Sequence, residues 1–565
     1  MKVYEKIINI AVLNIMSLYG NFCRKRYLHR SESVDKIFEK QLLKLLKKNR
    51  NTEYGQKYNF ASIHSIKEFQ DKVPLSEYDD IRSYLERTAE KGEQNLLSSE
   101  KIEYLASTSG TTGVTKMLPV SEKTYIPYVR CASIFIWMLK QEMNKRGIRG
   151  GKGLESIETD YKVTKGGIKL GFISGYALDS ARIIMPAINV MPKESFGYGD
   201  DIDIKYIKAR YALQDRDLVY MMSVFMSYLT DLVVYMIDHQ DMLINDIEKG
   251  IIDESVNIPL DMRKKLSRKL RPDPKRAEEI RQVLKQEDRQ GMLSKLWPKL
   301  TMIVAIGTGE FRPYKEKMKF YCNNDVLFCN EMYAASEALF ASAMEPETYD
   351  YLLIPDAGFF EFLPVDNEDS RPLLAHELEK GKQYEIIVTT FAGLYRYQIK
   401  DVVSVTDFVG KNPMIQFAYR KNQLINIKGV KLTIEHLDST IAAFEKRSGI
   451  KVRDYSIYSD VDQVPWRAVI YLELEEDPAD LDVRAIMEEE LMKANEEYAR
   501  MLGVGDVSPL MVKIVKDRTF EFYRRMRVHS GVSTNQVKTI RFIYSKEKKN
   551  YFDEQTIKTY EKDGK

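Results

Sequence analysis

Small, hydroxyl-bearing and flexible residues are concentrated in one stretch of the chain, ASTSGTTGVTK, from Ala106 to Lys116. Backbone N–H groups and hydroxyls in such a stretch can surround phosphate oxygens, glycine allows close approach, and a lysine offsets the negative charge. The Walker pattern GxxxxGK[ST] is absent from the sequence, which argues against an ordinary P-loop NTPase. Surface loops collect the same residue types, so the stretch alone leaves both interpretations open.

Two further segments carry side chains suited to a nucleotide. YAASE, Tyr333–Glu337, follows one apolar strand pattern, and YRY with Asp401 follows another. An aromatic ring can stack on adenine, a glutamate can bind Mg²⁺, and an aspartate can accept hydrogen bonds from both ribose hydroxyls. Taken singly, each has an ordinary alternative: Tyr333 in the core, Glu337 as a charge at a helix N-terminus, and Asp401 in a turn.

The three motifs together resemble a known family. STSGTTGVTK, YAASE and YRYxxxD, in this order, look like the phosphate, adenine-and-magnesium and ribose motifs of the adenylate-forming superfamily. Within it the chain resembles the auxin-responsive acyl acid amido synthetases, the Gretchen Hagen family of plants and its bacterial relatives. The supporting stretches are VPLSEYDDI, GFFEFLPV, VTTFAGLYRYQIKDVV, FAYRKNQLINIKGVK and GVSTNQVKTIR, so the likeness spans about residues 50 to 541.

The resemblance implies three residues with a catalytic role. Lys116 would bind phosphate, Glu337 would hold Mg²⁺, and Lys538, in QVKTIR, matches the mobile lysine of the small domain. Two departures from the family pattern concern the last part of the chain. Ile540 stands where the plant pattern has proline, and Asn422 stands where many other adenylating enzymes have a hinge aspartate. Neither change removes a charge that the chemistry needs.

The other matching residues would bind ATP. Tyr333 would lie against the adenine and Asp401 would bind the ribose. Arg420, in FAYRKN, matches an arginine that contacts ribose or phosphate beside the hinge, and Phe417 matches the aromatic residue three positions earlier. The full set of nucleotide-binding residues that the resemblance implies is Ser107, Thr108, Ser109, Gly110, Thr111, Tyr333, Ser336, Asp401, Phe417 and Arg420.

The elements before residue 300 are expected to be mainly helical. The N-terminal stretch, with polar residues among apolar ones and no small-residue cleavage site, favours an amphipathic helix packed on the body over a signal peptide. Ser76 is expected to cap a helix, Ile102–Ala106 to form a strand, and Tyr125–Arg146 to form a helix. Leu218–Ile237 is long enough to cross a bilayer, but it contains Asp231, so we expect a buried core helix.

From residue 300 the pattern changes to short strands, TMIVAI, DVLFC, GFFEFLPV, YEIIVTT and DVVSVTDFV. Before them, residues 261–290 predict a helix, a break at two prolines and a second helix. A boundary is expected near Lys421, before a helix from Thr433, the strand WRAVIYLELE, one helix over 482–502 and the strand MVKIVK. We therefore expect a mixed α/β (α+β) fold, with a large domain over 1–421 and a small α+β domain over 422–565. The resemblance adds that the large domain carries β-sheets flanked by helices and a small β-barrel, and that the small domain is mobile.

The composition excludes some classes of protein. Lys and Arg number 86 and Asp and Glu 83, so the net charge of +3 does not call for nucleic acid as a partner. The four cysteines, Cys23, Cys131, Cys322 and Cys329, fit no CxxC or zinc spacing and suggest free thiols in a reducing, cytoplasmic compartment. We expect no metal cage, no stable membrane insertion, and a monomer or a weak dimer.

The activity implied by the resemblance has two steps. ATP with Mg²⁺ would adenylate a small carboxylic acid and release pyrophosphate, and an amine, expected to be an amino acid, would then take the acyl group and release AMP. An acyl-CoA ligase shares the first step, and the three motifs do not separate it from an amide-forming enzyme. A non-catalytic scaffold would be expected to lose the charges at the phosphate and metal positions, but they are present. The acid and the amine are not identified by the sequence; Met332 and Phe311 are candidates for the acyl pocket or for the core.

Overall fold

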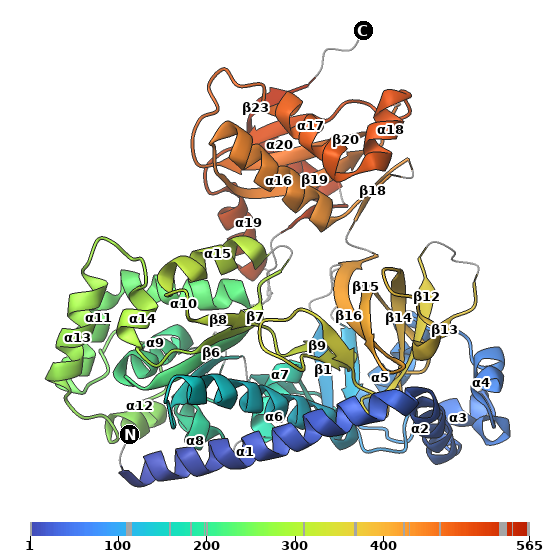
Figure 1. Cartoon of the computed structure of the whole chain (residues 1–565), viewed down its shortest axis with the longest axis horizontal. Coiled ribbons are helices and arrows are strands. Elements are labelled where there is room, and N and C mark those ends of the chain that lie inside the picture. Colours follow the sequence, from blue (N-terminus) through green and yellow to red (C-terminus); the bar gives the residue numbers. More distant parts are fainter. Residues whose placement is uncertain are drawn as a thin grey trace. The chain divides into compact units, whose positions relative to one another are not determined.

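The computed structural model describes residues 3–108, 116–157, 160–180, 184–196, 198, 202–308, 311–365, 370–421, 424–428, 430–462, 465–529, 540–544 and 546–561. The chain divides into two compact units (Figure 1). The large unit comprises Met1–Gly307 and Phe311–Ala418, and the small unit comprises Thr308–Glu310 and Tyr419–Lys565. Each unit mixes helices with β-sheets, in agreement with the expected α/β class.

The first hundred residues are helical, in α1 (Val3–Arg30), α2 (Val34–Asn49), α3 (Glu53–Lys57), α4 (Ile66–Lys72) and α5 (Tyr78–Lys91). Figure 1 shows α1 beside α6 (Glu122–Lys145) along one side of the large unit. The two helices approach closely at Gly20, where a Cβ atom would lie 1.9 Å from the Ser133 carbonyl oxygen. The prediction of an N-terminal helix packed on the body is confirmed, as is the helix predicted over Tyr125–Arg146.

Four parallel strands form a sheet in the order β3 (Lys152–Ser156), β6 (Leu218–Phe225), β7 (Met302–Ile306) and β8 (Leu327–Cys329). The helix predicted over Leu218–Ile237 is wrong, because its first part is strand β6 and only the second part is a helix, α10 (Met226–Asp238). A central strand of a parallel sheet is buried on both faces and is therefore as continuously apolar as a buried helix.

The large unit has two clusters of buried apolar side chains, and the helices around this sheet enclose one of them. The helix, break and helix predicted over 261–290 are confirmed as α12 (Leu260–Ser267) and α13 (Pro274–Leu284). The other helices of this region are α7 (Ile173–Ser180), α8 (Met185–Ile188), α9 (Ile204–Gln214), α11 (Gln240–Lys249), α14 (Met292–Leu296) and α15 (Arg312–Tyr321).

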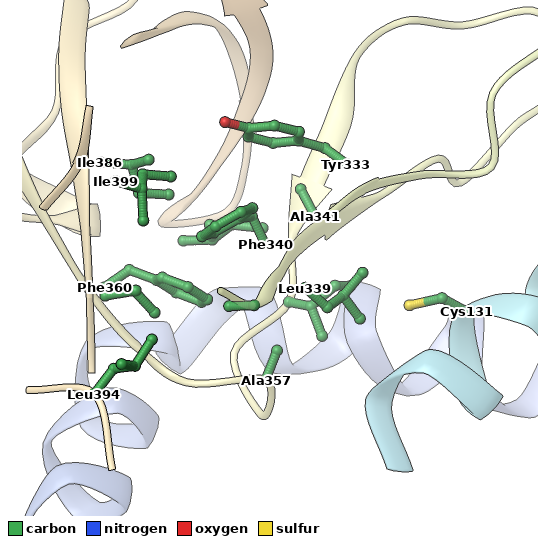
Figure 2. Packing of buried hydrophobic residues seen from close by; sticks show 14 of the residues in the cluster. Cys131, Tyr333, Leu339, Phe340, Ala341, Ala357, Phe360, Ile386, Leu394 and Ile399 are labelled. Carbon is green, nitrogen blue, oxygen red and sulfur yellow. The ribbon is translucent and has the colours of Figure 1, made fainter. Parts of the chain in front are cut away.

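Two other sheets of the large unit carry the motif segments. The first has the strand order β2 (Lys116–Val120), β1 (Tyr104–Thr108), β5 (Lys169–Gly171) and β4 (Tyr161–Val163). The second runs in the order β13 (Leu373–Leu374), β12 (Phe359–Pro364), β14 (Gln383–Thr389), β15 (Tyr397–Val409), β16 (Asn412–Arg420), β11 (Tyr351–Leu353), β10 (Leu339–Ser342) and β9 (Met332–Ala334). Figure 2 shows how Phe340 and Phe360 pack between Ile386 and Ile399 on one side and Leu339 and Ala357 on the other.

The small unit is built on a five-stranded sheet in the order β22 (Phe542–Ile543), β19 (Val452–Asp460), β20 (Arg467–Leu474), β21 (Met511–Val515) and β23 (Thr556–Tyr560). Its other elements are the hairpin β17 (Ile425–Ile427) and β18 (Val430–Leu432) and the helices α16 (Ile434–Ser448), α17 (Val483–Ala494), α18 (Glu496–Gly503), α19 (Thr519–His529) and α20 (Lys546–Glu554). The single helix predicted over 482–502 is two helices, because Asn495 adopts an extended conformation and its side chain caps α18 through the Tyr498 N–H at 2.8 Å.

Candidate functional site

Strands β1 and β2 hold the two ends of the Ser/Thr/Gly stretch. Ser107 pairs with Met117 and Thr108 pairs with Lys116 in antiparallel register, so Lys116 lies directly opposite the last residue of β1. The Lys116 ammonium lies 5.5 Å from the centre of the Tyr78 ring, and the Tyr78 hydroxyl accepts a hydrogen bond from the Met117 N–H at 3.1 Å. The half-buried Lys116 is therefore supported by an aromatic face at the edge of the predicted phosphate site.

Tyr333 and Asp401 meet although they are far apart in the sequence. The Tyr333 hydroxyl donates a hydrogen bond to Asp401 Oδ2 at 2.9 Å, and both side chains are buried. Tyr333 belongs to β9 and Asp401 to β15, which are four strands apart in the sheet order, so the sheet must curl to bring them together. The structure thus brings together the two segments that the resemblance assigns to adenine and ribose.

Phe417, on β16, completes this aromatic group. Its ring centre lies 6.1 Å from that of Tyr333, at an angle of 56°. Tyr333 also packs on Phe340, with 4.9 Å between the ring centres (Figure 2), and is only 8% exposed. Phe417 is 44% exposed, so it is the ring with open surface for a planar ligand.

A β-bulge directs the Asp401 side chain. In the pairing of β14 with β15, Glu385 faces Val402 and Ile387 faces Gln398, so three residues, Ile399 to Asp401, stand opposite Ile386 alone. Lys400, inside the bulge, has a φ of +66°, in the left-handed region that favours glycine. Bulges alter the direction of side chains and are common beside active sites. The local strain therefore accompanies the residue that we expect to bind ribose.

Glu337 and Ser336 follow β9 and are half-buried. Helix α6 contacts this turn, where the Tyr128 hydroxyl donates a long hydrogen bond of 3.4 Å to the Ala335 carbonyl. Burial, and secondarily the charge of Glu337, raise the pKa of Tyr128. Tyr128 therefore remains a neutral donor and adds no second negative charge next to the Glu337 side chain.

The YRY triplet before Asp401 has a structural role that the sequence did not reveal. Arg396 and Glu361 form a buried pair with two hydrogen bonds of 3.0 Å, and the Arg396 guanidinium also donates to the carbonyls of Gln70 and Val73 at 2.7 Å. Tyr395 donates a hydrogen bond to the Leu97 carbonyl at 2.8 Å. This segment therefore joins the curled sheet to the N-terminal helices.

Ser76 is part of the same junction, and its predicted role as a helix cap is wrong. Glu77 occupies the N-cap of α5, and its N–H donates to Asp80 Oδ2 at 2.8 Å. Ser76 instead donates its hydroxyl to the Tyr395 carbonyl at 2.7 Å and is buried. The difference arises because Ser76 pairs as an isolated bridge with Tyr397, which occupies its hydrogen-bonding groups.

Two carboxyl groups at the parallel sheet were also missed. Glu155, on β3, accepts a hydrogen bond of 2.6 Å from Tyr220 on β6, whose ring occupies the space that Gly153 leaves open. Glu331 lies just after β8, and burial together with the charge of Glu155 raises its pKa to about 7. Burial raises the pKa of Glu155 as well. No periodicity or motif distinguishes these two glutamates from surface ones.

Some predicted site residues lie outside this group or outside the described residues. Arg420 is the last residue of β16 and belongs to the small unit. Ser109, Gly110, Thr111 and Lys538 lie outside the residues that the structure describes, as does the side chain of Thr108. Two residues were candidates for the acyl pocket. Phe311 is buried in the apolar cluster around the parallel sheet, and its ring centre lies 4.5 Å from that of Phe225. Met332 is half-buried and packs against the other apolar cluster of the large unit, part of which Figure 2 shows.

Comparisons with known proteins agree with the motif arrangement. Three family models match the chain: the "GH3 family N-terminal domain" over residues 23–327, the "GH3 family central domain" over 351–420 and the "GH3 family C-terminal domain" over 435–547. The chain is 29% identical over 543 residues to the indole-3-acetic acid-amido synthetase GH3.8 of Oryza sativa subsp. indica, covering 90% of this chain and 88% of that protein.

It is 27% identical over 550 residues to the 4-substituted benzoates-glutamate ligase GH3.12 of Arabidopsis thaliana, covering 91% of this chain and 94% of that protein. Among solved structures, the "GH3.15 acyl acid amido synthetase" superposes with a TM-score of 0.82 at 24% identity, covering 95% of this chain and 97% of the other. This likeness extends over both units of the fold.

Proposed function

The chain belongs to the GH3 family, and from that premise we propose that it is a ligase that adenylates a carboxylic acid with ATP and transfers the acyl group to an amine. The observation that carries the proposal is the Tyr333–Asp401 hydrogen bond beside the exposed Phe417 ring. It supports the proposal because the two segments that we expect to bind adenine and ribose meet there. The relatives named above, which act on an indole acid and on benzoates with glutamate, support the choice of an amide product.

The nucleotide would lie along the curled sheet. Tyr333 lies against the adenine, for which the neighbouring Phe417 offers an open ring face. Asp401 accepts hydrogen bonds from the ribose hydroxyls, and the Tyr333 hydroxyl holds its carboxylate in place. The stretch between β1 and β2 would surround the phosphates, with the Lys116 ammonium at its end. Arg420, Ser336 and the residues from Ser107 to Thr111 keep the nucleotide-binding roles that the resemblance implies.

Adenylation solves a chemical problem of carboxylic acids. A carboxylate resists attack by amines because it is negatively charged and its oxygen is a poor leaving group. Attack of the acid oxygen on the α-phosphorus of ATP gives an acyl-AMP and pyrophosphate, and an amine nitrogen then attacks the acyl carbon with AMP as the leaving group. Lys116 and Lys538 would offset the negative charge that develops at the phosphates in the first step.

Glu337 fits the requirements of a magnesium ligand. Mg²⁺ is usually bound by one or two carboxylates together with substrate phosphates, and Glu337 is a half-buried carboxylate in the turn after β9. Bound there, Mg²⁺ would supply positive charge to the phosphate oxygens of ATP. Water would have to be kept from the acyl-AMP, and rotation of the small domain, expected over 422–565, is a physical means of doing so.

An acyl-CoA ligase remains the second candidate because it shares the adenylation step. The two candidates differ only in the acceptor, and thioester and amide products differ in mass. A cytoplasmic location and a monomeric or weakly dimeric state also stay predictions.

The test has two stages. ATP–pyrophosphate exchange measured against a panel of aryl, indolyl and fatty acids identifies the acid, because exchange requires reversible acyl-AMP formation. Mass spectrometry with the active acid, pooled amino acids and coenzyme A then identifies the acceptor. If none of the acids in the panel supports exchange, the result opposes the proposal. A CoA thioester without any amide would establish the second candidate.

Two substitutions distinguish a specific role of Lys538 from the general effect of removing a positive charge from the small domain. Lys538→Ala should slow pyrophosphate exchange by about 100-fold or more if its cation stabilises the developing charge. Lys446→Ala, which removes an exposed cation from α16 of the same unit, should leave exchange unchanged. Unchanged exchange in Lys538→Ala would remove this residue from the mechanism.

A further inference from the structure

Helix α1 has apolar side chains on two opposite faces. The inner face is buried on the large unit through Leu13, Cys23 and Tyr27. Besides Val3 at its first position, α1 has six large apolar residues that are at least half exposed and lie on the other side: Tyr4, Ile7, Ile8, Ile15, Leu18 and Phe22. At about 100° per residue these six fall within an arc of roughly 100° opposite the inner face. We call them the outer stripe.

The outer stripe is large for a surface that contacts only water. Leu18 is 73% exposed and Ile15 66%, and at about 200 Å² per large side chain the six together expose on the order of 700 Å². That is above the largest apolar patch on a typical monomer, which is roughly 300–600 Å². A patch of this size marks a contact surface.

The inner face prevents α1 from crossing a membrane in this fold. By length and composition, the stretch Val3–Asn49 is apolar enough to span a bilayer. However, the buried Asn9 side chain donates to the carbonyls of Gly151 and Ala187 at 3.0 and 2.8 Å and accepts from the Gly151 N–H at 2.9 Å. These bonds hold α1 on the body, so only its outer stripe is open to a contact.

The charges of α1 indicate the nature of the partner. The helix carries five Lys or Arg residues and one Glu. Arg24 and Arg30 pair with Glu345 and Asp356 of the body. Lys25 and Arg26 are exposed, lie on the side of the outer stripe at about 100° per residue, and form no ion pair with any described residue.

These unpaired cations decide between two occupants. A second copy of the chain would bring another α1 with five cations and a single glutamate, so it offers too few acidic groups to complement the first helix. An anionic lipid surface is complementary to both the stripe and its flanking cations.

We propose that α1 is a membrane-docking helix, which lies parallel to an anionic lipid surface with the outer stripe inserted and Lys25 and Arg26 on the headgroups. With 28 residues the helix is about 42 Å long, so the contact extends over several lipids. Binding of this kind is peripheral and reversible, and it decreases with added salt because the headgroup attraction is screened.

The experiment is flotation of the full chain with vesicles. Phosphatidylcholine alone is compared with phosphatidylcholine and phosphatidylglycerol at a ratio of about two to one. We expect binding to the anionic vesicles that decreases at high salt and is much weaker without phosphatidylglycerol. Lys25→Gln with Arg26→Gln should reduce the partition coefficient about 30-fold, since each cation near an anionic surface contributes about fivefold. Leu18→Ser with Phe22→Ser should reduce it at least tenfold through lost apolar burial.

Matched controls lie on α12. Leu260 is 75% exposed, much like Leu18, and Lys264 and Arg268 are exposed cations near it. Leu260→Ser and the pair Lys264→Gln with Arg268→Gln should leave vesicle binding unchanged, and circular dichroism checks that every variant is folded. Three results would overturn the proposal: no flotation with anionic vesicles, equal loss in the α12 controls, or a dimer in sedimentation velocity that Leu18→Ser dissociates while vesicles bind nothing.

Discussion

Deprotonation of Glu331 should destabilise the large unit as the pH rises. Its pKa is raised from 4.5 to about 7, first by burial and then by the charge of Glu155. Below a pH of about 4.5 the carboxyl group is protonated in both the folded and the unfolded chain, so its ionisation does not change the free energy of unfolding. Between about 4.5 and about 7 the unfolded chain loses the proton while the folded chain keeps it, so stability decreases with pH. At about 1.4 kcal/mol per unit, the loss is on the order of 3 kcal/mol.

The measurement compares Glu331→Gln with the unmodified side chain at about pH 5 and about pH 8. Other carboxyls also titrate in this range, so the useful quantity is the difference in unfolding free energy between the two proteins. The chain has three tryptophans, Trp137, Trp297 and Trp466, and only Trp466 lies in the small unit. In a Trp466→Phe background, tryptophan fluorescence during urea unfolding therefore reports on the large unit.

We expect Glu331→Gln to gain about 2–3 kcal/mol relative to the parent protein on going from the lower to the higher pH, because the amide cannot ionise. Glu254→Gln, at an exposed site, should show no such gain. Glu155→Gln should reduce the effect at Glu331, since it removes the second cause of the raised pKa. The reasoning is refuted if Glu331→Gln and Glu254→Gln have the same pH dependence.

Two further substitutions test the groups around Asp401. Tyr333→Phe removes the donor to a buried carboxylate and should destabilise the large unit by about 1.5–3 kcal/mol in urea unfolding; an unchanged midpoint would mean that the hydrogen bond contributes nothing. Arg396→Ala leaves Glu361 buried without its ionic partner and should lower the free energy of unfolding by about 3–5 kcal/mol. Arg371→Ala removes one partner of the Arg371–Glu377 pair, in which the arginine is 60% exposed, and should lower it by less than about 1 kcal/mol. Equal costs for the two arginines would contradict the buried-pair interpretation.

Local patterns in the sequence predicted the elements that are amphipathic or bounded by turn residues. The strand before the Ser/Thr/Gly stretch, the helix from 125 to 146 and the helix that Thr433 caps all have such signals, and each is present. The stretch Leu218–Ile237 has none, because a strand buried on both faces and a buried helix are both continuously apolar. Its division into β6 and α10 depends on the sheet that receives the first eight residues.

The meeting of Tyr333 and Asp401 at the candidate site could not be predicted from local patterns in the sequence. Tyr333 and Asp401 meet because strands that are four apart in one sheet curl toward each other, and no periodicity within a strand encodes that curvature. The resemblance to a family supplied the pairing that local patterns could not. Glu155 and Glu331 escaped both kinds of reasoning, since neither belongs to a family motif and only the packed sheet brings their charges close enough to interact.

Strand β16 connects the proposed nucleotide site to the boundary between the two units. Asp401 and Phe417 lie on β15 and β16, which are adjacent in the sheet. β16 then continues without interruption to Arg420, whereas the large unit ends at Ala418. A strand within a sheet is stiff along its length, and the Phe417 ring is only three residues from Arg420, which belongs to the small unit. If the small domain rotates between the two half-reactions, the strand that we propose to contact the nucleotide is therefore the connection through which occupancy of the site would affect that rotation.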